Sequence, residues 1–229
     1  MRTRSILIAV VTVCASVLSG CEFSIGTNTS SSNTTANANK AATNSANTST
    51  AKTDTKSDKP KLDDDAKPTS GTAKTAKKNP VPESWLYVYD SGKGYGFYLP
   101  EGSTGQSEKL QGIDVMLATT PAPSEIKVVV LAYKDETRTK EELLDDAIQF
   151  LEETGNKVTP GKLQAKSDEY AVADATTVNA DGSKGKMRIL VGTDVTDNYV
   201  MILATEEAKF AANESIIDQI WGSFEMWSS

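Results

Sequence analysis

The side chains that most often build metal centres and catalytic sites are scarce in this chain. It contains no histidine and only two cysteines, so a metal site would have to be made from carboxylates. Asp194 and Asp197 are the Ca²⁺ candidates, because an acidic turn can offer several oxygens. Their segment lacks the alternating ligands and the distal glutamate of an EF-hand loop, and a hairpin turn explains the same residues. The sequence therefore predicts no cofactor, with this turn kept as the Ca²⁺ alternative.

Paired carboxylates also occur between residues 141 and 153, where they could in principle act as a general acid and base. The apolar residues between them recur at helical spacing, so the pairs fall on the polar side of an amphipathic helix, where contact with solvent explains them. Ser49 and Lys52 match the S-x-x-K nucleophile pattern, but they lie among small polar residues that cannot hold two side chains in register. We therefore expect a protein that is not an enzyme.

Cys21 is the one residue whose neighbours point to a specific chemistry, which is acylation. Residues 1–20 begin with two arginines and continue with an apolar run shorter than the about 20 residues of a membrane-spanning helix. Leu18, Ser19 and Gly20 directly precede the cysteine, and this pattern resembles the bacterial lipobox. The resemblance implies cleavage by signal peptidase II and a lipid anchor, with palmitate among its acyl chains, on the new N-terminal cysteine.

The rest of the chain divides into a polar tether and one folded domain. Residues 21–80 consist mostly of Ser, Thr, Asn, Ala, Lys and Asp, and such a segment cannot bury enough apolar surface to offset the entropy of ordering it. We therefore predict a disordered tether there. Residues 81–229 hold all three Trp and all seven Tyr and have the usual size of one domain. The acidic residues are concentrated in the same part, so the domain has no electrostatic reason to bind nucleic acid.

Short alternating or continuous apolar runs predict β-strands in residues 81–229. Thr139 and Glu142 form a capping box at the start of a helix that ends near Gly155. A second helix is predicted over 216–224. This order predicts an α+β fold, in which an antiparallel sheet is packed by two main helices and is preceded by the signal peptide and the disordered linker. The predicted strands cover 85–89, 95–99, 115–118, 126–133, 170–178, 187–191 and 199–204.

The order of these segments resembles the PsbP-like domains. A first strand ends in an acidic residue, and a second, glycine–aromatic strand from Tyr95 closes at Leu-Pro-Glu101. A helix after an apolar strand, a meander, and a last helix ending in Trp-Gly-Ser-Phe224 continue the likeness over most of 81–229. The resemblance implies the fold of that family and a tendency toward protein binding. It carries over no functional residue, because the matching positions are structural.

Two groups of aromatic and apolar residues are the candidate partner or ligand surface. The first belongs to the opening strands and the second lies near residue 229. Tyrosine and tryptophan are common at recognition surfaces, but packing in the core explains both groups as well. The candidate residues are Trp85, Tyr87, Tyr89, Tyr98, Met226 and Trp227.

These patterns together favour a lipid-anchored lipoprotein of the bacterial cell envelope whose tethered domain binds or scaffolds an envelope protein. The alternative is a module that binds a small ligand or Ca²⁺ in the periplasm or at the cell surface. In either case the lipid on Cys21 would hold the protein at a membrane, on the exported side of the cytoplasmic membrane. In a Gram-negative source, Glu22 after the cysteine would favour the outer membrane over the inner one.

Overall fold

The computed structural model describes residues 73–77, 79–110 and 112–227. All of them belong to one compact unit of the chain. The whole of the predicted signal sequence and lipobox lies outside these residues, as does the predicted tether apart from 73–77, 79 and 80. In particular, Leu18, Ser19, Gly20 and Cys21 lie outside the described residues.

The larger of two sheets contains eight antiparallel strands in the order β4-β5-β6-β11-β10-β9-β7, with β8 paired to β9. Its centre is buried on both faces, because β6 and β11 are nearly continuous apolar runs. The strands are β4 (Thr104–Leu110), β5 (Ile113–Thr119), β6 (Lys127–Tyr133), β7 (Lys157–Pro160), β8 (Gln164–Ala165), β9 (Tyr170–Val178), β10 (Lys184–Asp194) and β11 (Asp197–Glu206).

A smaller sheet joins the two ends of the described chain. Its four strands have the order β1-β12-β3-β2, so the C-terminal strand is inserted between strands from the N-terminal part. The first of them precedes residue 81, the predicted start of the domain, and Ala76 just after it is buried. The strands are β1 (Ala73–Thr75), β2 (Leu86–Asp90), β3 (Tyr95–Leu99) and β12 (Glu225–Trp227).

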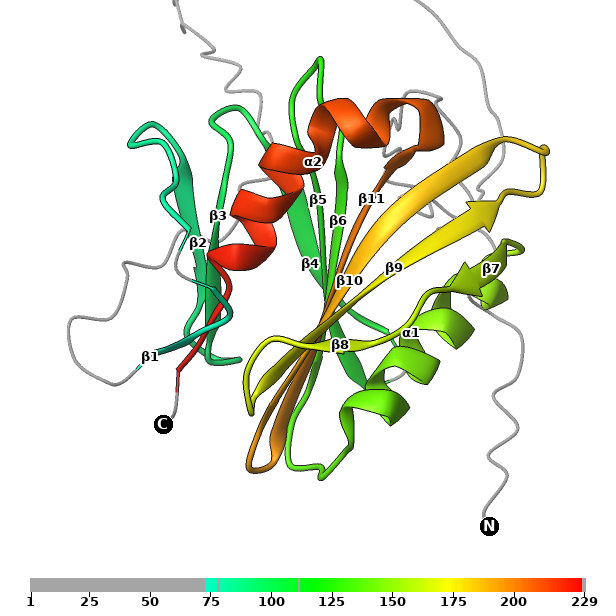
Figure 1. The fold of residues 1–229 in the computed structure, drawn as a ribbon. Helices are drawn as coiled ribbons and strands as arrows, with labels where there is room; N and C mark the ends of the chain where they lie inside the picture. The colour runs from blue at the N-terminus through cyan, green and yellow to red at the C-terminus, as the bar shows by residue number, and fades with distance from the viewer. Residues whose placement is uncertain (1–72, 78, 111, 228–229) are drawn as a thin grey trace, which may run out of the picture. The chain divides into compact units, whose positions relative to one another are not determined.

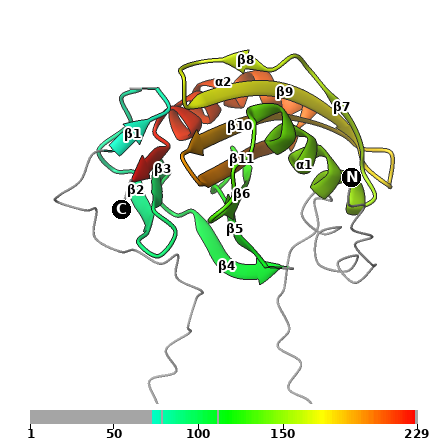
Figure 2. The ribbon, with the colours of Figure 1, turned by 90° about the horizontal axis from the view of Figure 1, so that it is seen from below.

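The large sheet is the middle layer of the molecule, and different elements cover its two faces. The small sheet and α2 (Glu207–Gly222) pack on one face and share a buried core with it. Helix α1 (Lys140–Glu153) packs on the other face and forms a second core. Figure 1 shows the two helices and the small sheet around the large sheet, and Figure 2 shows the large sheet bending from β4 round to β7 with α1 on its concave side.

Helix α1 begins as the sequence predicts. The Thr139 side chain accepts from the Glu142 amide, and the Glu142 carboxylate accepts from the Thr139 amide at 2.8 Å. These reciprocal bonds satisfy amides that have no partner inside the helix. The helix then buries Leu143, Ala147 and Leu151 along one stripe, which fixes the direction in which its remaining faces point.

The prediction of one antiparallel sheet packed by two main helices is wrong. The described residues form twelve strands in two sheets with two helices, so strands dominate, and a second sheet packs beside α2 on one face of the large sheet. Two features of the sequence conceal the additional strands. Thr104–Leu110 is a polar strand without a clear alternation, and Glu225–Trp227 is a strand of three residues. Local periodicity records which residues of a strand face a core, but not which sheet the strand joins.

Candidate functional site

Half of the predicted aromatic surface lies together on the outer face of the small sheet. Tyr87 and Tyr98 are directly opposite each other in the β2–β3 pair, with ring centroids 4.8 Å apart. Trp227 on β12 joins them, and all three side chains are partly exposed. Gly96 makes this arrangement possible, since a Cβ at that position would collide with the Tyr87 hydroxyl.

The other predicted members of this surface are buried or packed against the core. Trp85 packs against the core between the two sheets, and Met226 is 1% exposed within that core. Tyr89 is 8% exposed, with its ring edge-on to Trp227 at 6.2 Å between centroids. The strand alternation that groups Trp85, Tyr87 and Tyr89 in the sequence does not separate buried from exposed members, because neighbouring segments cover some positions of the same face.

Hydrogen bonds tie the outer aromatic face to the small sheet. The Tyr87 hydroxyl donates to Glu225 Oε2 at 2.8 Å and accepts from Trp227 Nε1 at 3.2 Å. Burial and the Glu225 hydrogen bond raise the pKa of Tyr87 above its usual value. The phenol is thus a neutral hydrogen-bonding group at physiological pH, which suits recognition better than proton transfer.

The predicted Ca²⁺ candidates are both paired with lysines. Asp194 Oδ1 lies 2.9 Å from Lys74 Nζ, and Asp197 forms an ion pair with Lys134. Within the described ranges, no group of three or more metal-ligating acidic or cysteine side chains converges. These carboxylates hold β1 and the chain after β6 against the β10–β11 turn.

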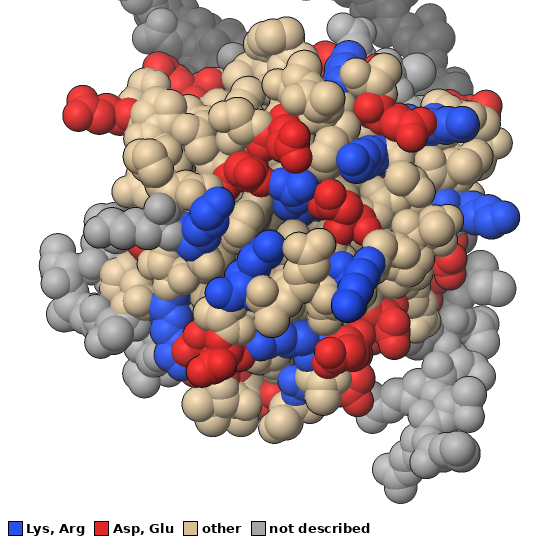
Figure 3. Space-filling view, viewed as in Figure 1, with Lys and Arg blue, Asp and Glu red and all other residues tan. Residues whose placement is uncertain are grey.

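A second cluster of charges ties α2 to the large sheet. Arg188 Nε donates to Asp174 Oδ1 at 2.8 Å, and the same guanidinium pairs with Asp218 on α2. The indole of Trp221 donates to Asp218 at 2.8 Å. These residues border a polar cavity of about 300 Å³ on the face where Figure 3 shows basic and acidic side chains interleaved. Because every carboxylate named has a cationic or N–H partner, the cluster functions as a structural clamp.

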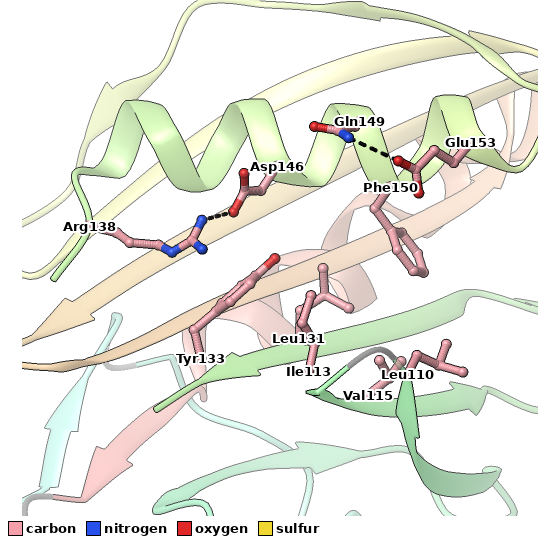
Figure 4. A pocket seen from close by; sticks show the side chains of 10 residues that line it. All are labelled: Leu110, Ile113, Val115, Leu131, Tyr133, Arg138, Asp146, Gln149, Phe150 and Glu153. Carbon is pink, nitrogen blue, oxygen red and sulfur yellow. Dashed lines mark hydrogen bonds and ion pairs between the residues drawn. The ribbon is translucent and has the colours of Figure 1, made fainter. Parts of the chain in front are cut away.

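An apolar groove lies between α1 and the β4–β5–β6 end of the large sheet. Its volume is about 160 Å³, and Figure 4 shows aliphatic side chains from the sheet facing an aromatic side chain from the helix. It is open because α1 packs over β7, β10 and β11 and does not extend over the first strands of the sheet. The apolar residues that line it are Leu110, Ile113, Val115, Leu131, Tyr133 and Phe150.

The rim of the groove is polar and carries more acidic than basic side chains. Arg138 bonds to Glu136 at 2.7 Å, forms an ion pair with Asp146, and lies over the Tyr133 ring at 4.7 Å from its centroid. Its charge is therefore already matched. Desolvation raises the pKa of Asp146 despite the nearby guanidinium, and burial raises the pKa of Tyr133. The rim can supply hydrogen bonds and negative charge to a bound group, but Tyr133 stays protonated.

No sequence pattern identifies this groove. Phe150 is the one visible signal, because it is a large apolar residue outside the buried stripe of α1. Leu110 and Ile113 flank the turn between β4 and β5, a polar stretch in which no surface could be predicted. The described part of the chain also contains no helix long and apolar enough to cross a membrane.

Comparison with known proteins extends to the fold alone. No protein-family model matches the chain, and no curated protein is significantly similar to it in sequence. The solution structure of cyanobacterial PsbP (CyanoP) from Synechocystis sp. PCC 6803 matches with a TM-score of 0.50 and 15% identity, over 64% of this chain and 95% of that one. A crystal structure from Bacteroides thetaiotaomicron VPI-5482 matches with a TM-score of 0.42 and 9% identity, over 62% of this chain and 48% of that one. As the resemblance in the sequence implies and the CyanoP match supports, the described part of the chain has a PsbP-like fold.

Proposed function

We propose that the protein is a lipid-anchored module of a bacterial cell envelope that binds a partner protein and catalyses no reaction. The apolar groove between α1 and the β4–β5–β6 end of the large sheet is the observation that carries this proposal. Leu110, Ile113 and Phe150 are partly exposed although they pack against the core on the α1 side of the sheet. Burying such an apolar surface against another molecule is favourable, because it removes apolar area from water.

The anchor and the tether support a role at a membrane. The lipobox pattern ending at Cys21 would attach the chain to lipid on the exported side of the cytoplasmic membrane, in the periplasm or at the cell surface. The polar segment that follows would span roughly 40 Å as a flexible coil. That reach would let the domain search for a partner at some distance from the anchor.

The chemistry of the described side chains favours binding over catalysis. A general base needs a group that titrates near neutral pH and can reach a substrate. The Tyr133 phenol beside the groove has a raised pKa, and the guanidinium of Arg138 is held by two carboxylates. A surface with an apolar floor and a fixed polar rim is the usual composition of a recognition site.

Photo-crosslinking in cells tests this proposal at the groove itself. A photoreactive amino acid placed at Gln149, which lines the groove, should give one dominant protein adduct. The same amino acid at Glu152, exposed on the same helix but outside the groove, is the matched control. Cys21→Ser, which removes the predicted lipid attachment, should abolish the adduct. Equal adducts from both positions, or none from either, would contradict the proposal.

A further inference from the structure

Glu108 on β4 is a partly exposed acidic residue with one buried carboxylate oxygen that the fold leaves unsatisfied. One of its carboxylate oxygens, Oε1, is inaccessible to solvent and has no hydrogen-bond partner among the described residues. A buried acceptor of this kind costs free energy in the free protein. Unsatisfied buried groups are expected at functional sites, where a ligand can supply the missing hydrogen-bond donor.

The pairing of β4 with β5 places this carboxylate beside the groove. Glu108 is opposite Val115, and Leu110 is opposite Ile113. Residues directly opposite in an antiparallel pair have their side chains on the same face of the sheet. Since Val115, Leu110 and Ile113 line the groove, Glu108 continues the same row of side chains by one step along the sheet.

The helix across the groove adds further negative charge. Six of the fourteen residues of α1 are acidic, and Lys140 is its only basic residue. The ammonium group of Lys140 is bonded to the carbonyls of Ser167 and Asp168, away from the groove residues. With Arg138 already paired, the groove attracts a cation and repels an anion.

Strand β4 also offers a backbone to a ligand. It is the terminal strand of the large sheet in the described structure, as the end of the arc in Figure 2 shows. One side of a terminal strand presents N–H and C=O groups that another extended chain can pair with. Alternate side chains of a chain added there would point to the groove side of the sheet.

We propose that the groove binds an extended, basic and amphipathic polypeptide segment of the partner. An apolar side chain of that segment contacts Leu110 and Phe150, and a Lys or Arg two residues away pairs with Glu108. This assignment rests on the proposed function and specifies the chemistry of the partner. A small amphiphilic amine would satisfy the apolar floor and the carboxylate, but it would leave the edge of β4 unused.

A peptide titration on the full chain tests the assignment. The probe is acetyl-Val-Thr-Leu-Thr-Lys-amide, in which alternate residues share one face. Its reversed sequence covers the opposite strand direction. At low salt, the tighter of the two should bind at least about tenfold more strongly than the same peptide with Glu in place of Lys, and added salt should weaken its binding. Equal binding of the Lys and Glu peptides would overturn the assignment, as would tighter binding of hexylamine than of the peptide.

Substitution of Glu108 gives a second, opposite pair of readouts. Glu108→Leu should raise the melting temperature by about 2–6 °C, because it removes the unsatisfied buried oxygen, and should weaken binding of the Lys peptide about tenfold. Glu152→Gln removes one negative charge from α1 outside the groove and should change both quantities little. Glu108→Leu with unchanged peptide binding would overturn the assignment. If the Gln149 adduct still forms in that case, the proposed function stands and only the basic character of the partner is excluded.

Discussion

The two faces of the large sheet have the same strands behind them but are closed in different ways. On one face, α2 and the small sheet cover the strands with interlocking aromatic rings, among them Tyr95, Phe97 and Phe224. On the other face, α1 covers β11, β10 and β7 with aliphatic side chains and leaves the β4–β5–β6 end open. We infer that packing on the first face supplies most of the stability. The second face can therefore leave apolar side chains exposed for binding.

The largest effect should come from the aromatic core. Phe224 packs with Tyr95, Phe97, Tyr170 and Tyr199 at centroid distances of 5.8–6.3 Å. Phe224→Ala should lower the free energy of unfolding by about 3–5 kcal/mol, because it removes a large buried side chain and leaves a cavity. Urea unfolding of both proteins measures the difference. A loss below about 1 kcal/mol would show that the two faces do not differ as the packing indicates.

The same core predicts how stability depends on alkaline pH. Burial raises the pKa of Tyr95, Tyr170 and Tyr199, so the folded protein keeps protons that the unfolded chain releases above pH about 10. Stability should therefore be unaffected below that pH and fall above it, by about 4 kcal/mol for the three phenols together at pH about 11.

Unfolding by urea at several pH values, with phenolate absorbance recorded in the same samples, measures this linkage. Unfolding and the late rise in absorbance should coincide. Full ionisation of the phenols in a protein that is still folded would contradict the assignment of these residues to a dry core.

The clamp between α2 and the large sheet should have an intermediate effect. Arg188→Ala should cost about 2–3 kcal/mol, since it leaves Asp174 and Asp218 without their shared cation in a partly buried cluster. The matched control is Lys109→Ala, because that lysine is mostly exposed and its nearest carboxylate oxygen is 3.9 Å away. Thermal unfolding separates the two. Equal losses would mean that the clamp is no stronger than a surface ion pair.

The smallest effect on stability should come from the groove. Leu110→Ala should cost about 1 kcal/mol or less, because the side chain is only partly buried. The Gln149 adduct should nevertheless disappear, because the variant removes apolar contact area from the floor of the groove. A large loss of stability would assign Leu110 to the core and place the binding surface elsewhere.

Sequence patterns predict the elements of this fold better than their assembly. The capping box at Thr139 marks the start of α1 correctly, and the apolar run before Tyr133 marks β6. The alternation in Tyr87 and Tyr89 identifies a strand, but it could not separate a partly exposed ring from a buried one. The groove residues Leu110 and Phe150 are ordinary apolar residues in the sequence. They form a site only because α1 does not extend over β4 and β5.

What the sequence by itself determined is local: the caps, the apolar periodicities, the lack of histidine chemistry and the lipobox pattern, which predicts the anchor. Only the tertiary structure decided that there are two sheets, that β12 is inserted between β1 and β3, and that a buried carboxylate oxygen without a partner on β4 lies beside an open apolar groove. The physical reason is that periodicity depends on whether a side chain is buried at all. Pairing, coverage and unsatisfied polar groups depend on which distant segment does the burying.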